Sequence, residues 1–330
     1  MIKYVIDMEG GDNGYETTIP AVDRFLKEYP EIGFYVCGDE DKLKELKTKF
    51  PNNIEVVNAT EIVPMTAGAL DVLRLRKSSI MLGLEKMLLD GSAIISAGST
   101  GGFLSACTVK LKTIPGIKRA ALISPFPTYV KGKKVVILDI GANNENTPDE
   151  LVQFAIMGRL YSQIVFDIKE PKTFLLSNGA ETEKGSPVVK EASKKLIEMK
   201  FPGFSGNKEG NSVLDGEADV IVSEGFTGNV FLKSSEGMAK FFGRSIKGIF
   251  KRNFLTKIGY LLCKKGVKNL TETMEFKQFG GAMMLGINGV CVKAHGSSSP
   301  EAFYYSIKVA HQLVQGKVNE KLKEGIGNGE

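Results

Sequence analysis

Short apolar runs separated by helical stretches recur along the whole chain, and this alternation constrains the fold more than any other feature of the sequence. Most runs are rich in β-branched residues and apolar without interruption, which is typical of parallel strands buried on both faces. The predicted strands are residues 3–6, 34–36, 54–57, 93–96, 120–123, 134–138, 173–176, 219–222 and 290–293. The pattern predicts an α/β fold: a doubly wound, Rossmann-like, mostly parallel sheet inside an α/β/α sandwich.

Helical periodicity is clear at residues 79–89 and 148–164, where Pro148 suits the first turn of a helix. A C-terminal helix is expected from residue 299 toward residue 322. Although 330 residues permit two domains, large α/β sheets often form one. We therefore expect a single domain over residues 1–330, with a basic amphipathic helical excursion at about residues 236–275.

The composition is that of an ordinary soluble protein, with 42% hydrophobic and 25% charged residues. No segment approaches the ~20 apolar residues that span a bilayer, and the N-terminal apolar run is too short for a signal peptide. The four cysteines form no CxxC pair, and the chain has only two histidines. We therefore expect a reduced, cytoplasmic protein without a metal centre, in which Cys107 belongs to the core.

Five small, polar, glycine-rich loops follow predicted strands: 7–12 (DMEGGD), 96–102 (SAGSTGG), 139–143 (DIGAN), 223–229 (SEGFTGN) and 294–299 (AHGSSS). Glycine lets the backbone approach a ligand, and the amides at a helix N-terminus suit an anion. One such loop would be an ordinary tight turn, but five at the strand ends of one parallel sheet predict a shared phosphate or polyanion pocket. The candidate binding residues are Gly10, Gly11, Asp12, Gly98, Ser99, Thr100, Gly101, Asn143, Thr227, Gly228, Gly296, Ser297 and Ser298.

None of these loops matches GxGxxG or GxxxxGK[ST], so a dinucleotide or nucleotide cofactor is not supported and no cofactor is expected. In order and spacing, the loops instead resemble the motif set of the acyl-ACP:phosphate acyltransferase (PlsX) family. The family motif DxGAN is intact at residues 139–143 and LVQFAIMG at residues 151–158. Looser matches lie at residues 7–12, 96–102, 179–185, 225–233 and 280–298, so that the resemblance covers about residues 2–313.

This resemblance implies an enzyme, a homodimer, in which inorganic phosphate attacks an acyl carrier protein thioester. The products would be an acyl phosphate for phospholipid synthesis and free carrier protein, formed without a metal or nucleotide. Two alternatives remain. One is a phosphotransacetylase-like enzyme that uses acyl-CoA. The other is a catalytically weakened membrane scaffold for lipid enzymes, because several family loops are altered.

The resemblance also assigns roles to three side chains. Lys184, otherwise an ordinary surface lysine, would hold phosphate or neutralise the thioester oxyanion. Asn229 would be an active-site amide, with a helix N-cap as the alternative. His295 would organise its loop and contact phosphate, or act as the general acid for the leaving thiol, which is already a good leaving group. Asp7 and Asp12 are expected to orient loop backbone.

The positive charge of the chain is concentrated in one segment. Between Glu236 and Glu272 there are nine Lys and Arg residues and no acid, so the rest of the chain carries −4 against a total of +5. This segment could be a dimer arm, a tip for anionic lipid, or a receiver of acidic acyl carrier protein, whereas no nucleic-acid module accompanies it. We expect peripheral association with the inner face of the membrane. The membrane or partner residues would be Lys247, Lys251, Arg252, Phe254, Leu255, Lys257 and Ile258.

Overall fold

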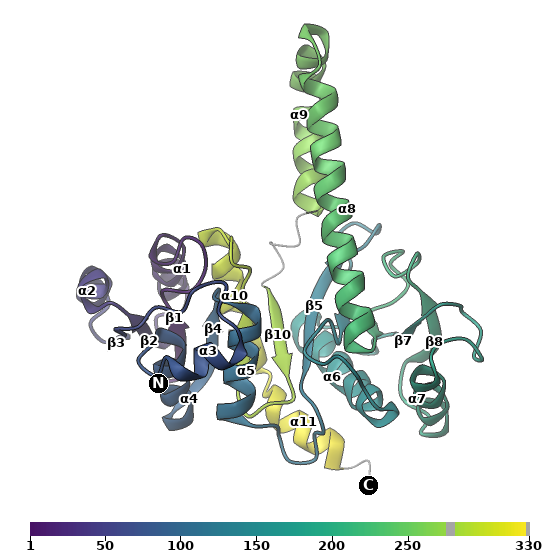
Figure 1. Cartoon of the computed structure of the whole chain (residues 1–330), viewed down its shortest axis with the longest axis horizontal. Helices are drawn as coiled ribbons and strands as arrows, with labels where there is room; N and C mark the ends of the chain where they lie inside the picture. The colour runs from purple at the N-terminus through teal and green to yellow at the C-terminus, as the bar shows by residue number, and fades with distance from the viewer. Residues whose placement is uncertain (275–280, 328–330) are drawn as a thin grey trace.

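The computed structural model of the protein describes residues 1–274 and 281–327. Their strands are β1 (Lys3–Asp7), β2 (Gly33–Gly38), β3 (Ile54–Asn58), β4 (Gly91–Ser96), β5 (Ala121–Pro127), β6 (Lys134–Leu138), β7 (Thr173–Ser177), β8 (Phe204–Glu209), β9 (Val220–Val222), β10 (Ala282–Leu285) and β11 (Val290–Lys293). Within the described residues they form one 11-stranded sheet in the order β3-β2-β1-β4-β11-β10-β5-β6-β9-β7-β8 (Figure 1). All nine predicted strands are present, and the predicted α/β, mostly parallel fold is confirmed.

The directions of the strands correct one expectation. β3, β2, β1, β4 and β11 pair in parallel, as do β6, β9, β7 and β8. Between these blocks, β10 is antiparallel to both β11 and β5, and β5 is antiparallel to β6. The two blocks therefore run in opposite directions, and the five glycine-rich loops do not share one edge of a single parallel sheet.

Helices cover both faces of the sheet (Figure 1). Their bounds are α1 (Tyr15–Glu28), α2 (Glu40–Lys49), α3 (Ala69–Arg74), α4 (Ser79–Leu89), α5 (Thr100–Leu111), α6 (Pro148–Phe166), α7 (Pro187–Glu198), α8 (Gly225–Lys251), α9 (Phe254–Met274), α10 (Pro300–Gln315) and α11 (Val318–Gly327). At the start of α6, the Thr147 hydroxyl caps the Glu150 amide and the Glu150 carboxylate accepts from the Thr147 amide, as a capping box requires. The predicted C-terminal helix is divided instead, because the chain turns at Gly316 and at Lys317, which has a φ of +53°.

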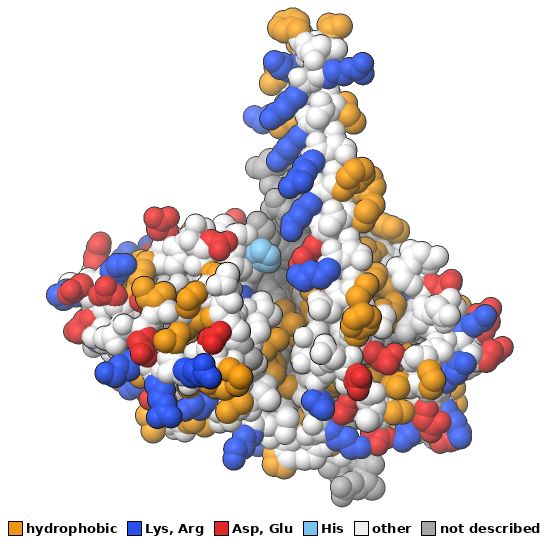
Figure 2. Space-filling view, viewed as in Figure 1, with side chains coloured by type: hydrophobic (Ala, Val, Ile, Leu, Met, Phe, Trp, Pro, Cys, Tyr) orange, Lys and Arg blue, Asp and Glu red, His pale blue; other side chains and the backbone are white. Residues whose placement is uncertain are grey.

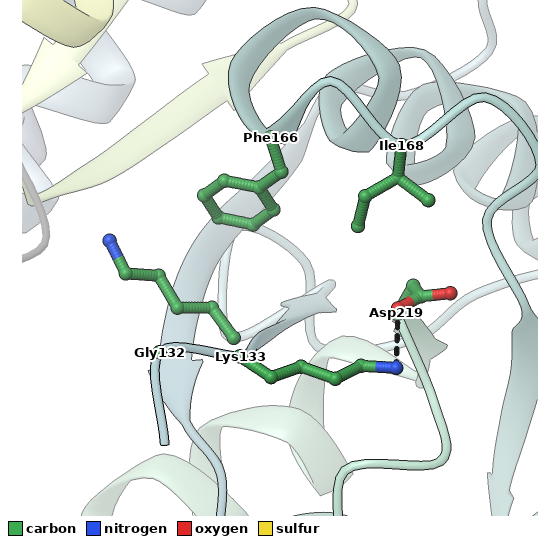
Figure 3. Close-up of a pocket in the computed structure, with 6 residues that line it drawn as sticks. Gly132, Lys133, Phe166, Ile168 and Asp219 are labelled. Carbon is green, nitrogen blue, oxygen red and sulfur yellow. Dashed lines mark ion pairs between the residues drawn. The ribbon is translucent and has the colours of Figure 1, made fainter. Parts of the chain in front are cut away.

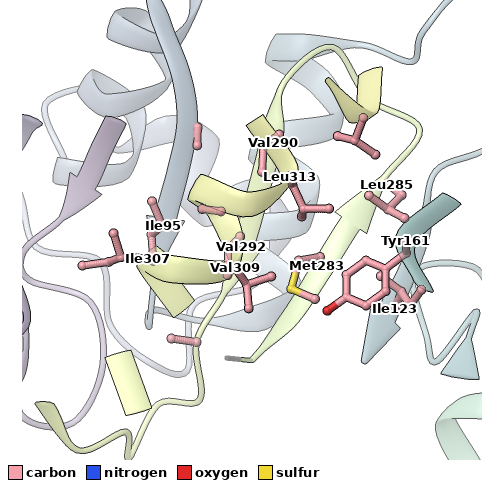
Figure 4. Close-up of a cluster of buried hydrophobic side chains, with 14 of the residues drawn as sticks. Ile95, Ile123, Tyr161, Met283, Leu285, Val290, Val292, Ile307, Val309 and Leu313 are labelled. Atoms are coloured by element: carbon pink, nitrogen blue, oxygen red, sulfur yellow. The ribbon is translucent and has the colours of Figure 1, made fainter. Parts of the chain in front are cut away.

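Alternating side chains of the strands build one apolar cluster on each face of the sheet. On β1, for example, Tyr4 and Ile6 belong to one cluster and Val5 to the other. Figure 4 shows the first cluster at the centre of the sheet, where side chains from helices α6 and α10 cover β4, β5, β10 and β11. Cys107 is fully buried in the second cluster, as expected for a core residue. These two layers fix the strand ends that position the candidate site.

Helices α8 and α9 form a hairpin that projects far beyond the sheet (Figure 1). The predicted excursion began at about residue 236, but α8 begins at Gly225, within the loop after β9. At 27 residues, α8 is about 40 Å long. Thus one helix belongs both to the site and to the projection. Among the helices described, none combines the length and apolarity that a membrane crossing requires.

Candidate active site

The loop after β1 is held by a buried carboxylate. Asp7 is 1% exposed, and it accepts hydrogen bonds from the amides of Glu9 and Gly10 at 3.3 and 3.1 Å. The Ser79 and Ser96 hydroxyls donate to the same side chain at 2.6 and 2.5 Å. Burial raises the pKa of Asp7, while these donors act in the opposite direction. Asp7 therefore orients the loop backbone, as expected.

The loops after β1, β4 and β11 pack against one another. The Asp12 amide donates to the Gly296 carbonyl oxygen at 2.8 Å. Gly11 has a φ of +94°, and a Cβ there would lie 2.8 Å from the same oxygen. A Cβ on Gly10 would lie 2.7 Å from the Gly98 amide nitrogen. Glycine is therefore required at residues 10 and 11 by close backbone approach, and these two glycines shape the site from behind.

A second group of loops is built around Asp139. Its carboxylate accepts from the Leu122 amide at 2.9 Å, from the Gly141 amide at 3.1 Å and from the Asn143 amide and side chain at 2.9 and 2.8 Å. The bond to Leu122 holds the end of β6 beside the start of β5. Burial raises the pKa of Asp139, opposed by these donors. The Asn143 side chain thus serves the loop and also binds the Ala120 carbonyl oxygen at 2.8 Å.

The first turns of α8 pack directly on this second group. A Cβ on Gly225 would lie 2.0 Å from the Asn143 carbonyl oxygen, and one on Gly228 would lie 1.9 Å from the Asp139 carbonyl oxygen. Gly141, with a φ of +124°, leaves room for the Asn229 side chain, whose Cγ would be 3.0 Å from an added Cβ. These contacts anchor α8 and fix the position of Asn229.

A cavity of about 920 Å³ lies between the two groups of loops, below one face of α8. It is lined by Asp12, Thr100, Gly101, Leu122, Ser124, Ile140, Gly141, Asn229, Lys233, Glu236, Lys240, Arg244, Lys247, Ala282, Lys293, His295, Gly296 and Ser297, together with Met65, Leu104, Leu232, Ala239, Gly243, Ile246, Gly281 and Ala294. Five of the lining side chains are cationic and two are carboxylates, an excess that suits an anionic ligand. Figure 2 shows Lys and Arg side chains continuing from the hollow of the body up the stalk.

The predicted site residues divide into three groups. Asp12, Thr100, Gly101, Asn229, His295, Gly296 and Ser297 line the cavity together. Gly10, Gly11, Gly98, Ser99, Asn143, Gly228 and Ser298 lie in the supporting loops and outside the lining, and Thr227 is exposed on the first turn of α8. Ser99 caps α5 by accepting from the Gly102 amide, and its hydroxyl donates to the Ala67 carbonyl oxygen at 2.8 Å. Most of the predicted glycines therefore shape the cavity from behind its wall.

His295 follows β11 and faces the cavity. The Ser297 amide, which can only donate, lies 3.2 Å from His295 Nδ1, and the Ser297 hydroxyl lies 3.0 Å from it. Nδ1 is therefore an acceptor, so the neutral ring carries its proton on Nε2. This geometry supports the loop-organising role. The second histidine, His311, pairs with the Tyr4 hydroxyl at 2.8 Å in another part of the fold.

Lys184 lies outside the cavity lining. Its loop follows β7, and the Asn207 side chain donates to the Glu181 and Lys184 carbonyl oxygens at 2.7 and 3.4 Å. The side chain of Lys184 is exposed. The loop nevertheless reaches the start of α8, because the Ser186 hydroxyl donates to Glu224 at 2.7 Å.

One lining residue, Lys293, was not among the predicted site residues. It ends β11, between Ser96 of β4 and Ala282 of β10, and is only 5% exposed. Burial lowers the pKa of Lys293 to about 8, although Asp7 and Asp12 act to raise it. A lysine at a strand end is usually solvated, and the sequence contained no signal for its burial other than its place inside the 280–298 motif.

A second hollow of about 530 Å³ lies at the opposite end of β6 (Figure 3). Its lining includes Lys133 and Asp219, which form an ion pair at 3.0 Å. No glycine-rich strand-end loop contributes to it, and its carboxylate is already neutralised. Within the described residues, no group of three His, Cys, Asp or Glu side chains is arranged to hold a metal ion. The larger cavity is therefore the candidate active site.

The arrangement defines a class: an α/β protein with a cleft lined mainly by cationic side chains between two oppositely directed strand blocks, a fold that it shares with phosphotransacetylases. A phosphotransacetylase from Streptococcus pyogenes superposes with a TM-score of 0.63 at 19% identity, covering 96% of this chain and 94% of that one. A branched-chain phosphotransacylase from Enterococcus faecalis superposes with a TM-score of 0.54 at 13% identity, covering 95% and 99%.

The chain belongs to the family described as "Fatty acid synthesis protein", the PlsX family, whose model matches residues 2–321. A phosphate acyltransferase of Citrifermentans bemidjiense is 38% identical over 98% of this chain and 94% of its own. A phosphate acyltransferase of Nitratiruptor sp. is 34% identical over 99% and 98%. The resemblance found in the sequence is thus confirmed at the level of the family.

Proposed function

We propose that this protein is a phosphate acyltransferase that transfers the acyl group of an acyl carrier protein thioester to inorganic phosphate. The observation that carries the proposal is the cavity itself, which joins the α5 N-terminus, the Asn229 amide and the 295–297 loop beneath a cationic helix face. Its volume of about 920 Å³ admits phosphate together with the end of an acyl-pantetheine chain. The relatives named phosphate acyltransferase support the reaction class.

The chemistry requires positioning and electrostatic stabilisation more than proton transfer. Phosphate oxygen attacks the thioester carbonyl carbon, the C–O bond forms and the C–S bond breaks. Neutral donors such as Asn229 and the first amides of α5 can stabilise the oxyanion of the tetrahedral intermediate. The thiol is acidic enough to leave with little assistance, so His295 serves mainly to order its loop.

The carrier protein is favoured over CoA as the donor because of α8. On the face of α8 that lines the cavity, Lys233, Lys240 and Lys247 are spaced seven residues apart, with Arg244 beside them. This row leads from the cavity up the hairpin and complements an acidic protein surface. A donor that is a small molecule would need only the part of the row nearest the cavity.

A phosphate-dependent assay with both donors tests the proposed function. Acyl phosphate is trapped as the hydroxamate, with matched acyl-carrier-protein and acyl-CoA substrates. We expect the enzyme to form acyl phosphate from the carrier-protein thioester only when phosphate is present. The kcat/KM for this donor should be at least about tenfold higher than that for acyl-CoA, equivalent to about 1.4 kcal/mol. A preference for acyl-CoA would favour a phosphotransacetylase-like enzyme. Vesicle binding without product would favour a scaffold.

Gly101 offers a selective test of the phosphate subsite. A Cβ added there would meet no atom within 4 Å, so a larger side chain enters ligand space without disturbing the protein. Gly101→Val is expected to raise the KM for phosphate on the order of tenfold, or about 1.4 kcal/mol, and to change the KM for the acyl donor much less. Steady-state kinetics with each substrate varied in turn measures both values.

The neighbouring glycine supplies the matched control. A Cβ on Gly102 would lie 2.4 Å from Val72 Cγ2, so Gly102→Ala should lower the Tm through overpacking. Equal rises in both KM values for Gly101→Val, with a lowered Tm, would mean general damage and would contradict phosphate binding at this helix N-terminus.

The homodimer is supported by the other face of α8. Here Phe226, Val230, Met238, Phe241, Phe242 and Ile249 are each 47–66% exposed and lie away from the cavity. Figure 2 shows hydrophobic side chains gathered along the side of the stalk. An exposed apolar stripe on one long helix is typical of a protein interface, and a second copy of this chain would cover it. The tip of the hairpin would remain available to anionic lipid.

A further inference from the structure

Lys293 is a buried cation that forms no ion pair with any described residue. Its side chain is 5% exposed at the end of a central strand. Nζ donates to the Ala294 carbonyl oxygen, and no ion pair among the described residues includes Lys293. Burying an ammonium group without a paired anion is strongly unfavourable, because the charge loses its hydration. A natural sequence carries such a cost where the charge has a function.

The nearby acids do not satisfy this charge. The Asp7 carboxylate is occupied by the hydroxyls of Ser79 and Ser96 and by two loop amides. Asp12 acts on Lys293 through space only and itself lines the cavity. An ammonium group has three N–H donors, of which the Ala294 carbonyl takes one. The cavity is the open space that Lys293 lines, so a ligand there can accept the others.

We propose that Lys293 is a catalytic residue that binds the attacking phosphate, donating hydrogen bonds from its ammonium group to a phosphate oxygen inside the cavity. The inference rests on the proposed function and identifies the Lys293 ammonium group as the charge that holds the attacking phosphate. The dianion HPO₄²⁻ attacks the thioester carbonyl, the C–O bond forms, and the C–S bond breaks. The phosphate proton leaves with the thiolate as free thiol, and Lys293 remains an ammonium throughout. No atom is oxidised or reduced.

If Lys293 binds phosphate, its titration should appear in the pH dependence of phosphate affinity. Because the pKa of Lys293 is lowered to about 8 in the free protein, its charge is present below that pH and lost above it. Phosphate affinity and kcat/KM for phosphate should therefore fall as the pH rises through about 8. The other titratable and charged groups that face this space are Asp7 on β1, Asp12 and His295 in the loops, and Lys233, Glu236, Lys240, Arg244 and Lys247 on α8. Inorganic phosphate loses its second proton at a pH below 8, so its own titration affects only the acidic side of the pH profile.

The test titrates inorganic phosphate into wild-type protein and into Lys293→Met by calorimetry between pH 6.5 and 9, with steady-state kinetics alongside. We expect at least about a tenfold loss of phosphate affinity in Lys293→Met and disappearance of the fall near pH 8, because a hydrogen bond to a charged group is lost. The KM for the acyl donor should stay within about twofold, and Lys293→Arg should recover part of the affinity. Lys194→Met, on the exposed side of α7, is the control for loss of one positive charge.

Each outcome decides the proposal. Unchanged phosphate affinity in a folded Lys293→Met would overturn it. If circular dichroism shows that this variant is unfolded, Lys293→Gln is tested in its place, because glutamine keeps a donor for the Ala294 carbonyl oxygen. The wild-type titration stands independently of any variant, because phosphate affinity that is flat across pH 8 also refutes the role. If the wild-type protein binds phosphate with this pH dependence but forms acyl phosphate from neither donor, the proposed function fails while the Lys293 site stands.

Discussion

Replacing Asn229 by alanine is expected to lower turnover by about 100-fold or more while leaving the fold intact, the scale seen when one oxyanion donor is removed. Asn229 lines the cavity, and its side chain rests on Gly141, whose missing Cβ leaves the necessary space. Turnover is measured at saturating phosphate and acyl donor, and the Tm checks the fold. In the proposed role, the neutral amide of Asn229 stabilises negative charge that develops only in the transition state, so the KM values should change less than kcat.

Two further variants sharpen this expectation. Asn229→Asp keeps the shape against Gly141 but replaces the donor with a negative charge, so it should be at least as inactive as the alanine variant. Val230→Ala, one residue further and about 100° around α8, outside the cavity lining, is the matched control and should retain activity. Near-normal turnover of Asn229→Ala would leave this residue only an ordinary role in the first turn of α8.

Lys184→Ala provides a comparison with a residue suggested by family resemblance alone. If Lys184 holds phosphate or neutralises the oxyanion, Lys184→Ala should lose about as much turnover as Asn229→Ala. Its exposed position outside the cavity lining is also that of a surface lysine, whose removal would change turnover little. Measured with the same substrates, the two losses show whether the 178–185 loop acts in the reaction.

Replacing Phe254 and Leu255 by serine is expected to abolish the salt-resistant part of binding to anionic vesicles. The two side chains are 75% and 76% exposed at the start of α9. Figure 1 shows that α8 and α9 meet at the tip of the hairpin. Such apolar residues insert at the membrane interface, while each nearby Lys or Arg contributes roughly 1 kcal/mol that salt can screen. Vesicle co-sedimentation at low and high salt separates the two parts.

The matched control is Leu88→Ser with Leu89→Ser, a pair of adjacent leucines that are 57% and 76% exposed at the end of α4, on the body of the protein. This variant should bind vesicles like wild type. Sizing of the hairpin variant distinguishes the alternative of a buried dimer arm. An active dimer that no longer sediments supports lipid contact at the tip, whereas a monomeric, poorly folded product would contradict it.

Sequence patterns located most strands but not their directions. The apolar runs of the nine predicted strands reflect burial on both faces, which is a local signal. β8 was missed because its sequence FSGNKE is polar and lies at the edge of the sheet, and β10 is only four residues long. The reversal between the two blocks depends on antiparallel pairing of β5 with β6, the next strand in the chain, and with β10, which is distant in sequence. An apolar run marks a buried strand but not the direction in which it pairs.

In the candidate site, too, some features are visible in the sequence and others arise only from the fold. Glycine-rich loops are visible in sequence because close backbone approach excludes other residues, and these loops do surround the cavity. Lys293 was not predicted because its burial arises only when β4 and β10 pair on either side of β11. For Lys184, the sequence motif gave a role, but whether a lysine reaches a ligand depends on the path of the loop after β7.

Helix α8 is unbroken from the cavity to the tip of the hairpin, so movement of the tip is transmitted to the cavity wall. Its first turns are fixed against residues 139–143, where Gly225 and Gly228 leave no room for even one additional carbon, so this end is the fulcrum. The next turns, about five of them, form a wall of the cavity, and the same unbroken helix continues to its far end, about 40 Å from its start. A force applied at the tip therefore turns the wall about its anchored end, and the mouth of the cavity widens or narrows in proportion to the distance from that point. Contact at the tip would therefore change the width of the opening to the proposed active site.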